Sequence, residues 1–290
     1  MKPAPFCYAR PKSLAEALSL LAAAGGEAKL LAGGQSVVPM LNMRLVRPAV
    51  LVDLNAVPGL DGIAALPDGG LTIGALARHA DVAASPLVHD RAPLLAEAAR
   101  HVGHAAIRNR GTLGGSLAHA DPAAELPAVL VALDAELILT GPGAARSVPA
   151  SAFFLGLLST ALGVDEILTE IRLPARGPGW GFAEVVRRHG DFALAGVAAV
   201  VRTGAGRPGR CEEAVLVGFG VGDRPIRLTP SERIAAGAGL DPEMAARAAA
   251  AAGLACDPPD DVHASSEYRR HLATVLTERA LLQAFGRLGL

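Results

Sequence analysis

Cysteine is scarce in this sequence of 290 residues, which has only Cys7, Cys211 and Cys256, far apart along the chain. Three scattered thiols provide neither a disulfide framework nor the clustered thiolates that zinc and iron–sulfur sites require. We therefore expect reduced cysteines, a cytoplasmic protein and no metal site within this chain.

Aromatic residues are equally sparse, at 3% of the sequence, and neither sign of charge dominates, with 27 Lys and Arg against 28 Asp and Glu. So few rings make a base-stacking surface for single-stranded nucleic acid improbable. A net charge of −1 gives no field that would collect polyanions or anionic lipids. We expect no nucleic-acid partner.

Long apolar runs are also missing. The longest, residues 193–201, is about half of a membrane span and lies between Asp191 and Arg202. The N-terminus begins with prolines and charged residues rather than the apolar segment of a signal peptide. We expect a soluble chain without integral membrane contact, whose 51% hydrophobic residues suffice for a sizeable core.

The opening of the chain has β-α-β character. Ser13 and Glu16 form a capping-box pattern, which predicts a helix over residues 13–24. Short apolar runs predict strands at 28–31 and 50–53.

Beyond residue 60, short strands alternate with turns and helices. We expect a hairpin turn at 67–70, helices at 77–84, 93–101 and 127–133, and strands at 135–139, 146–148 and 166–173. The Pro- and Gly-rich segment 174–179 is the best candidate linker. After it we expect strands at 182–187, 193–203 and 211–218, and helices that begin near 241 and 267.

Two glycine-bearing loops, residues 32–36 and 111–116, carry the candidate chemistry. A Gly-Gly pair lets backbone amides approach a phosphate without an intervening Cβ, and the hydroxyls of Ser36, Thr112 and Ser116 add donors. Two converging loops would supply the donors of a diphosphate site without lysine. Either loop alone is more typical of a structural turn than of a phosphate site, and neither has the spacing of a Rossmann or P-loop motif.

Together, these loops resemble the FAD-binding medium subunits of the molybdenum hydroxylases, the family of xanthine dehydrogenase and aerobic carbon monoxide dehydrogenase. The resemblance covers essentially the whole chain, in the expected order and spacing. The matching segments are residues 31–36, 39–40, 52–54, 107–116, 121–128, 190–193 and 267–270.

The resemblance implies an α+β fold in two parts. The first is a vanillyl-alcohol-oxidase-type (PCMH) FAD-binding domain over residues 1–176, made of two α+β subdomains at about 1–57 and 58–176. The second, over residues 177–290, is a smaller α+β domain of the CO dehydrogenase flavoprotein type with a three-stranded antiparallel sheet.

The resemblance also implies an FAD site. The two loops would hold the diphosphate, Glu125 would lie near the ribityl or ribose hydroxyls, and Leu168 would lie against the flavin or adenine. Phe192 would lie at the isoalloxazine face, where related proteins have Tyr, and Arg187 would support negative charge on the reduced flavin. The predicted cofactor-binding residues are Leu31, Ala32, Gly33, Gly34, Gln35, Ser36, Val37, Gly111, Thr112, Gly114, Gly115, Ser116, Glu125, Leu168, Arg187 and Phe192.

Several of these residues also have ordinary structural interpretations. Glu125 can favour a helix start through the helix dipole, Asp121 can form a turn before Pro122, and Phe192 can pack in a core. Residues 187–189, Arg-Arg-His, are typical of a solvated or ion-paired cluster.

Other basic residues near the second loop have alternatives of the same kind. His101 and His104 are three residues apart, but no third ligand accompanies them, so a solvent or loop contact is the better interpretation. Arg108 and Arg110 can contact a neighbouring subunit instead of the cofactor.

The resemblance implies an oxidoreductase subunit with no catalytic side chain of its own, whose reactive group is FAD. A small partner subunit with two [2Fe–2S] clusters would relay electrons, and a large molybdopterin-containing molybdenum subunit would oxidise the substrate, in a dimer of heterotrimers. FAD would reduce NAD, oxygen, quinone or another acceptor. A stand-alone FAD-dependent oxidoreductase and a non-redox module for another phosphorylated ligand are the alternatives.

Overall fold

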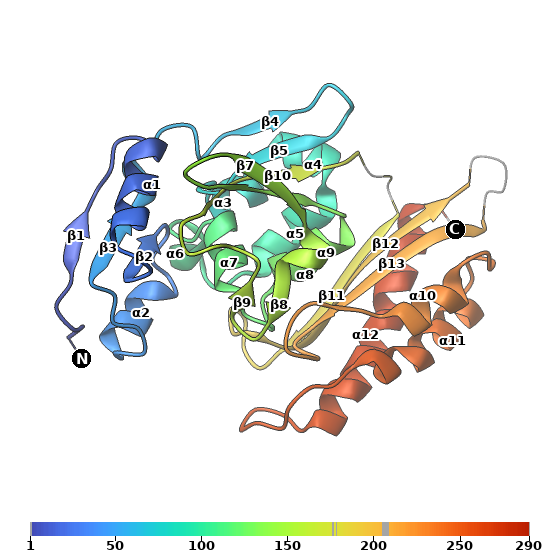
Figure 1. The fold of residues 1–290 in the computed structure, drawn as a ribbon. Coiled ribbons are helices and arrows are strands. Elements are labelled where there is room, and N and C mark those ends of the chain that lie inside the picture. Colours follow the sequence, from blue (N-terminus) through green and yellow to red (C-terminus); the bar gives the residue numbers. More distant parts are fainter. Residues whose placement is uncertain (1, 176, 178, 205–208, 290) are drawn as a thin grey trace.

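The structure is a computed structural model that describes residues 2–175, 177, 179–204 and 209–289. Three main sheets follow one another along the chain, and in Figure 1 they lie from left to right in chain order, each with its own helices. The α+β fold class is therefore confirmed. The boundary expected at residue 176 and part of the linker at 174–179 lie outside the described residues.

The first sheet is parallel and has the β-α-β character that the sequence predicts. Its order is β1 (Cys7–Ala9), β3 (Val50–Asp53), β2 (Ala28–Leu31), and helix α1 (Leu14–Ala23) packs against it. The Ser13 hydroxyl caps α1 by accepting from the Glu16 amide. The Glu16 carboxylate, however, accepts from the Lys12 amide, one residue earlier than a capping box requires.

The second sheet is antiparallel, and helices surround it. Its order is β4 (Ile63–Ala65), β5 (Leu71–Gly74), β10 (Ile167–Leu173), β6 (Glu136–Thr140), β7 (Ala145–Pro149). Its helices are α3 (His79–Ala84), α4 (Pro86–Arg91), α5 (Pro93–His101), α6 (Ala105–Arg108), α7 (Leu113–His119), α8 (Glu125–Ala132) and α9 (Ala150–Phe153). A small hairpin, β8 (Phe154–Gly156) and β9 (Ser159–Thr160), follows α9.

The third sheet is antiparallel and contains the three long strands that the sequence predicts, plus a fourth, two-residue strand. Its order is β11 (Trp180–Val186), β12 (Ala193–Thr203), β13 (Cys211–Phe219), β14 (Ile226–Arg227). In Figure 1, helices α10 (Thr229–Ala235), α11 (Pro242–Ala252) and α12 (Ser266–Arg287) lie along one face of this sheet.

Both faces of the third sheet are buried. Along β12, Ala198 and Val200 belong to the core of the middle part of the chain, whereas Val197, Ala199 and Val201 belong to the core under α10–α12. This alternation has the period of a strand. It explains the apolar run at 193–201: the run is a strand between two cores. Among the described residues, no helix has the length and apolar character to span a bilayer.

A short helix follows the first glycine loop, and another begins within the second, although the sequence predicts only loops there. Helix α2 (Val37–Asn42) begins after Ser36. Thr112 is the N-cap of α7, and its hydroxyl accepts from the Gly115 amide at 3.1 Å. Gly114 and Gly115 thus lie in the first turn of a helix. The Thr112 cap offsets part of the free-energy cost of glycine in a helix.

Candidate functional site

The two glycine loops converge. A methyl group at Gly33 would lie 2.3 Å from the carbonyl oxygen of Arg110 and 2.7 Å from the Cα of Gly111. On the other side, Gly115 lies against Ala32, because a methyl group added at Gly115 would lie 3.7 Å from the Ala32 Cβ. Backbone from two distant parts of the chain is thus in direct contact, and glycine at position 33 makes this approach possible.

A polar network that the sequence analysis missed holds the loops together. Arg78 donates from one guanidinium nitrogen to the Arg110 carbonyl and from the other to Asn55 Oδ1, at 2.6 Å. The Asn55 amide in turn donates to the Ala32 carbonyl at 2.8 Å. No local sequence pattern marks this connection, because its residues are 23 and 32 positions apart.

The first loop offers unused hydrogen-bond donors. Among the described residues, the backbone amides of Gly33, Gly34, Gln35 and Ser36 have no acceptor. The Ser36 hydroxyl does not cap α2. Consecutive free amides next to a glycine with positive φ, here Gly34 at 76°, form a concavity that suits an anion. This observation fits a diphosphate group.

The sequence predicts that the amides of the second loop donate to a diphosphate, but those of Gly114 and Gly115 donate within the protein. The Gly114 amide donates to the Ala75 carbonyl at 2.8 Å, and the Gly115 amide donates to Thr112 Oγ1. A methyl group at Gly114 would lie 2.5 Å from the Ala75 Cβ. These glycines therefore permit close packing within the protein, and their amides are already used.

A cleft of about 810 Å³ opens beyond α7. Its walls are the turn at 121–123, the segment 187–194, and the loop at 257–263. Two predicted residues, Arg187 and Phe192, line it, and Phe192 is 59% exposed, so the core-packing alternative for Phe192 is wrong. The lining includes neither glycine loop. Helix α7 begins within the second loop, and its last residue, His119, lies two positions before Asp121 of the cleft.

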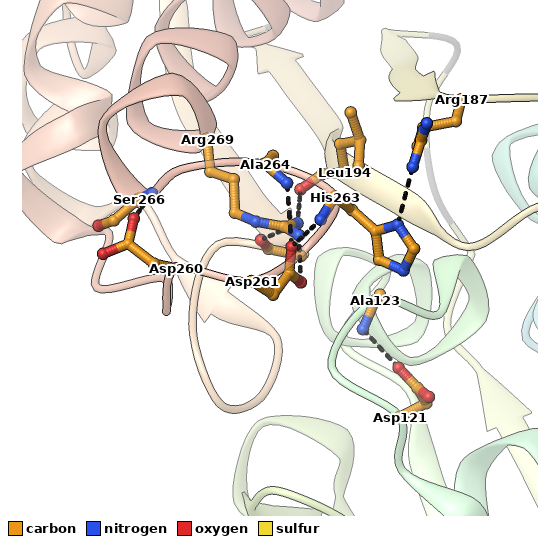
Figure 2. A network of polar contacts seen from close by, with 11 residues as sticks. Asp121, Ala123, Arg187, Leu194, Asp260, Asp261, His263, Ala264, Ser266 and Arg269 are labelled. Carbon is orange, nitrogen blue, oxygen red and sulfur yellow. Dashed lines mark hydrogen bonds and ion pairs between the residues drawn. The ribbon is translucent and has the colours of Figure 1, made fainter.

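A local contact bears out the turn interpretation of Asp121, and Arg187 has a hydrogen bond of its own. Figure 2 shows Arg187 donating to His263 Nδ1, at 3.1 Å, and the Asp121 carboxylate accepting from the Ala123 amide, at 2.9 Å. Asp121 thus forms a turn and also lines the cleft. Arg187 likewise lines the cleft and contacts His263. Asp121 and Arg187 therefore each combine a structural contact with a position at the cleft.

Arg269 joins the walls of the cleft. As Figure 2 shows, its guanidinium donates to the Leu194 carbonyl and to Asp261 Oδ2, the latter at 2.7 Å. It also reaches the Gly220 carbonyl at 3.4 Å, and the Gly220 amide donates to the Pro122 carbonyl at 2.8 Å. Arg269 lies within the matching segment 267–270, but no local pattern in the sequence predicts a role for it.

The structure buries two predicted cofactor residues in the protein interior. Glu125 is the first residue of α8 and is 4% exposed, and Leu168 in β10 is 5% exposed within the core. Neither lines the cleft. Burial raises the pKa of Glu125 to about 7, because desolvation disfavours the ionised form.

The histidines near the second loop make protein contacts. His101 Nδ1 lies 2.8 Å from Glu184 Oε1, and the ring of His104 lies against Gly190. Arg108 donates to the carbonyl of Gly103, at 2.8 Å, within its own loop. Within the described ranges, no group of three or more His, Cys, Asp or Glu could hold a metal ion.

Two known families match consecutive parts of the chain. Residues 4–176 match the family described as the FAD binding domain in molybdopterin dehydrogenase, and residues 180–284 match the CO dehydrogenase flavoprotein C-terminal domain. Both matches agree with the sequence resemblance.

Similar proteins span the whole chain. The 6-hydroxypseudooxynicotine dehydrogenase complex subunit alpha of Paenarthrobacter nicotinovorans is 42% identical over 289 residues, which are 99% of this chain and 97% of that protein. The carbon monoxide dehydrogenase medium chain of Hydrogenophaga pseudoflava is 38% identical, with 99% of both chains covered.

Solved structures agree with these sequence matches. A chain of carbon monoxide dehydrogenase from Hydrogenophaga pseudoflava superimposes with a TM-score of 0.95 at 38% identity, covering 99% of both chains. A chain of quinoline 2-oxidoreductase from Pseudomonas putida 86 gives 0.94 at 37% identity, with 99% of this chain and 100% of that chain covered. This protein therefore belongs to the FAD-binding medium subunits of the molybdenum hydroxylase family, as an oxidoreductase subunit with FAD as its cofactor.

Proposed function

We propose that this chain transfers electrons within a molybdenum hydroxylase complex: FAD takes them from [2Fe–2S] clusters of a partner subunit and passes them to an external acceptor. The observation that carries the proposal is the run of four free amides at 33–36, held in contact with the second loop. When bound, FAD supplies the redox chemistry, since it exchanges electrons with both one-electron and two-electron partners.

The chain's own residues bind and orient the cofactor. The amides of residues 33–36, with the Ser36 hydroxyl, would hold the diphosphate, and the second loop would fix the position of the first. The exposed ring of Phe192 and the guanidinium of Arg187 would form the wall next to the flavin. Glu125 and Leu168, which are buried, would contribute through the shape and polarity of the protein interior around the cofactor.

We also propose that the partners are a small iron–sulfur subunit and a large molybdenum subunit, in a dimer of heterotrimers. Exposed apolar side chains support partner contacts, because large apolar surfaces are unusual on a monomer. They cluster after the first loop, at Val38, Met43 and Leu45, and at the β8–β9 hairpin, at Leu155, Leu157 and Leu158. The separate third sheet supports the proposed division of the chain into 1–176, with subdomains of about 1–57 and 58–176, and 177–290.

Removal of FAD from the purified complex tests the electron path. With the [2Fe–2S] clusters reduced under anaerobic conditions, we expect their electron paramagnetic resonance signals to decay rapidly when an acceptor is added. In the same complex stripped of FAD, the signals should persist, and added FAD should restore the decay. Equal decay with and without FAD would contradict the proposal. A chain that purifies alone, with full activity on an organic substrate, would instead indicate a stand-alone oxidoreductase.

A further inference from the structure

Three successive carbonyl groups of the first glycine loop accept hydrogen bonds from within the protein. The Ala32 carbonyl accepts from the Asn55 side-chain amide at 2.8 Å, and the Gly33 carbonyl accepts from Gln35 Nε2 at 3.0 Å. The Gly34 carbonyl accepts from a backbone amide of α2, at 3.1 Å. The directions of these carbonyl groups are therefore set by protein donors.

The geometry of the peptide bond links each of these carbonyls to one of the free amides. In a planar trans peptide, the C=O of one residue and the N–H of the next point in opposite directions. The hydrogen bond from Asn55 to the Ala32 carbonyl therefore aims the Gly33 N–H away from Asn55. The bonds to the next two carbonyls do the same for the amides of Gly34 and Gln35. This explains why these amides have no acceptor among the described residues.

Asn55 is the only one of the three donors that lies far from the loop in sequence. It belongs to the short 3₁₀ helix η1 (Leu54–Ala56), directly after β3, which is the middle strand of the first sheet. Its bond to Ala32 spans 23 residues. Gln35 and α2 move with the loop, whereas Asn55 attaches the loop to the sheet.

Two neighbours fix the direction in which the Asn55 side-chain amide faces. Asp53 Oδ1 accepts from the Asn55 side-chain nitrogen at 2.5 Å and from its backbone amide at 2.9 Å. Arg78 donates to Asn55 Oδ1 at 2.6 Å. A reversed amide would place its oxygen against the Asp53 carboxylate and the Ala32 carbonyl, and its NH₂ group against the guanidinium. Only the observed orientation satisfies all three contacts.

Asp53 is present as an ionised acceptor. It is 8% exposed, and the Tyr8 hydroxyl donates to its second oxygen at 2.5 Å. Although burial opposes it, hydrogen bonds from Tyr8 and Asn55 lower the pKa of Asp53 below its ordinary value. The carboxylate therefore keeps both nitrogen atoms of Asn55 in place over the neutral pH range.

We propose that Asn55 is a positioning residue for the diphosphate of FAD: by holding the Ala32 carbonyl, it aims the Gly33 amide into the concavity of the first loop. Asp53 and Arg78 keep the Asn55 amide in the required orientation, and Asn55 needs no contact with the cofactor. Because the donor is aimed before the cofactor binds, less conformational freedom is lost on binding. The inference rests on the proposed function, since it takes the first loop as the diphosphate site.

Equilibrium binding of FAD to Asn55→Ala tests the proposal. The variant leaves the Ala32 carbonyl without its donor, so the peptide between residues 32 and 33 can rotate. We expect FAD to bind about three- to tenfold more weakly, the effect of about one lost hydrogen bond.

Ser13→Ala is the matched control. It also removes a side chain that holds a backbone group near the first sheet, here the Glu16 amide at the start of α1. Loss of this cap lowers stability without changing a contact of the loop. The affinity of Ser13→Ala for FAD should equal that of the wild type.

Nuclear magnetic resonance distinguishes positioning from a purely structural role. In chains labelled with ¹⁵N-glycine, saturating FAD should strongly shift the Gly33 amide signal of the wild type and of Ser13→Ala. In Asn55→Ala, that shift should be much smaller. Wild-type affinity for FAD in Asn55→Ala, or a Gly33 shift of wild-type size, would overturn the proposal.

The wild type alone provides a second test if Asn55→Ala does not fold. The chain has three asparagines, Asn42, Asn55 and Asn109, so ¹⁵N-asparagine labelling gives three side-chain amide signals. Asn55 and Asn109 are both exposed, but both side-chain protons of Asn55 are hydrogen-bonded. The Asn55 signal should therefore exchange with solvent more slowly than the Asn109 signal.

The outcomes separate this inference from the proposed function. Equally fast exchange of Asn55 and Asn109 would overturn the positioning role, even in a chain that binds FAD tightly. A wild-type chain with slow Asn55 exchange that does not bind FAD would overturn the proposed function, and the positioning role with it.

Discussion

Replacing Arg269 by methionine is expected to lower the free energy of unfolding by about 2–5 kcal/mol, because the buried guanidinium satisfies two backbone carbonyls and pairs with Asp261. Arg269 is 6% exposed, and its loss leaves the Leu194 and Gly220 carbonyls without their guanidinium donor. Each buried acceptor left unsatisfied costs about 1–3 kcal/mol. Chemical denaturation of the two proteins measures the difference.

Asp261 limits the cost to the lower part of that range. Although burial opposes it, hydrogen bonds from the amides of Ala264 and His263 and from Arg269 lower the pKa of Asp261 to about 2. The Asp261 side chain is 40% exposed, so water and both amides still solvate it when Arg269 is replaced.

The neighbouring residue provides the control. Arg270 pairs with Asp257, a side chain that is 99% exposed, and exposed pairs contribute about 0–1 kcal/mol. Arg270→Met should therefore cost much less than Arg269→Met. Equal losses for the two variants would show that Arg269 does not hold the walls of the cleft together.

Replacing Glu125 by glutamine is expected to change how stability depends on pH. The pKa of Glu125 rises from 4.5 in the unfolded chain to about 7 in the fold. The folded state therefore binds more protons, and its stability is full below pH 4.5 and declines as pH rises towards 7. A shift of this size corresponds to about 3 kcal/mol. Glutamine stays neutral, so the variant lacks this decline.

Denaturation of both proteins at pH 5 and pH 8 checks this prediction. From pH 5 to pH 8, the free energy of unfolding of the wild type should fall relative to that of Glu125→Gln, by about 3 kcal/mol. Glu243→Gln, on the exposed surface of α11, should follow the wild type. Parallel stability curves for the wild type and Glu125→Gln would mean that Glu125 is ionised in the fold at both pH values.

Local patterns predict much of this fold. The strands at 28–31 and 50–53 match β2 and β3 residue for residue, and Ser13 caps α1 as expected. These elements depend on apolar runs and on a capping residue, which are visible within a few positions of sequence.

Long-range contacts explain what the patterns do not predict. Gly114 and Gly115 have the pattern of a loop because glycine disfavours helices by about 1 kcal/mol, but the approach of Ala75 requires glycine at position 114. Arg269 reaches a carbonyl 75 residues away, which no local spacing reveals. For the site, the sequence pairs the two loops correctly, yet it does not show that the amides of Gly114 and Gly115 are already used.

We propose that the free amides of the first loop, pressed against the second loop, hold the diphosphate of FAD. Gly33→Ala tests it, because the added methyl group would lie 2.3 Å from the Arg110 carbonyl oxygen and must separate the loops. Gly62→Ala is the control, since a methyl group there meets nothing within 4 Å.

The measurement is equilibrium binding of FAD to the wild type and to both variants. The wild type should bind FAD, with a stabilisation of ~2.7 kcal/mol at a hundredfold excess over Kd. Gly62→Ala should match it, and Gly33→Ala should bind about tenfold more weakly or worse, ~1.4 kcal/mol. A folded Gly33→Ala variant with the affinity of the wild type would contradict the account.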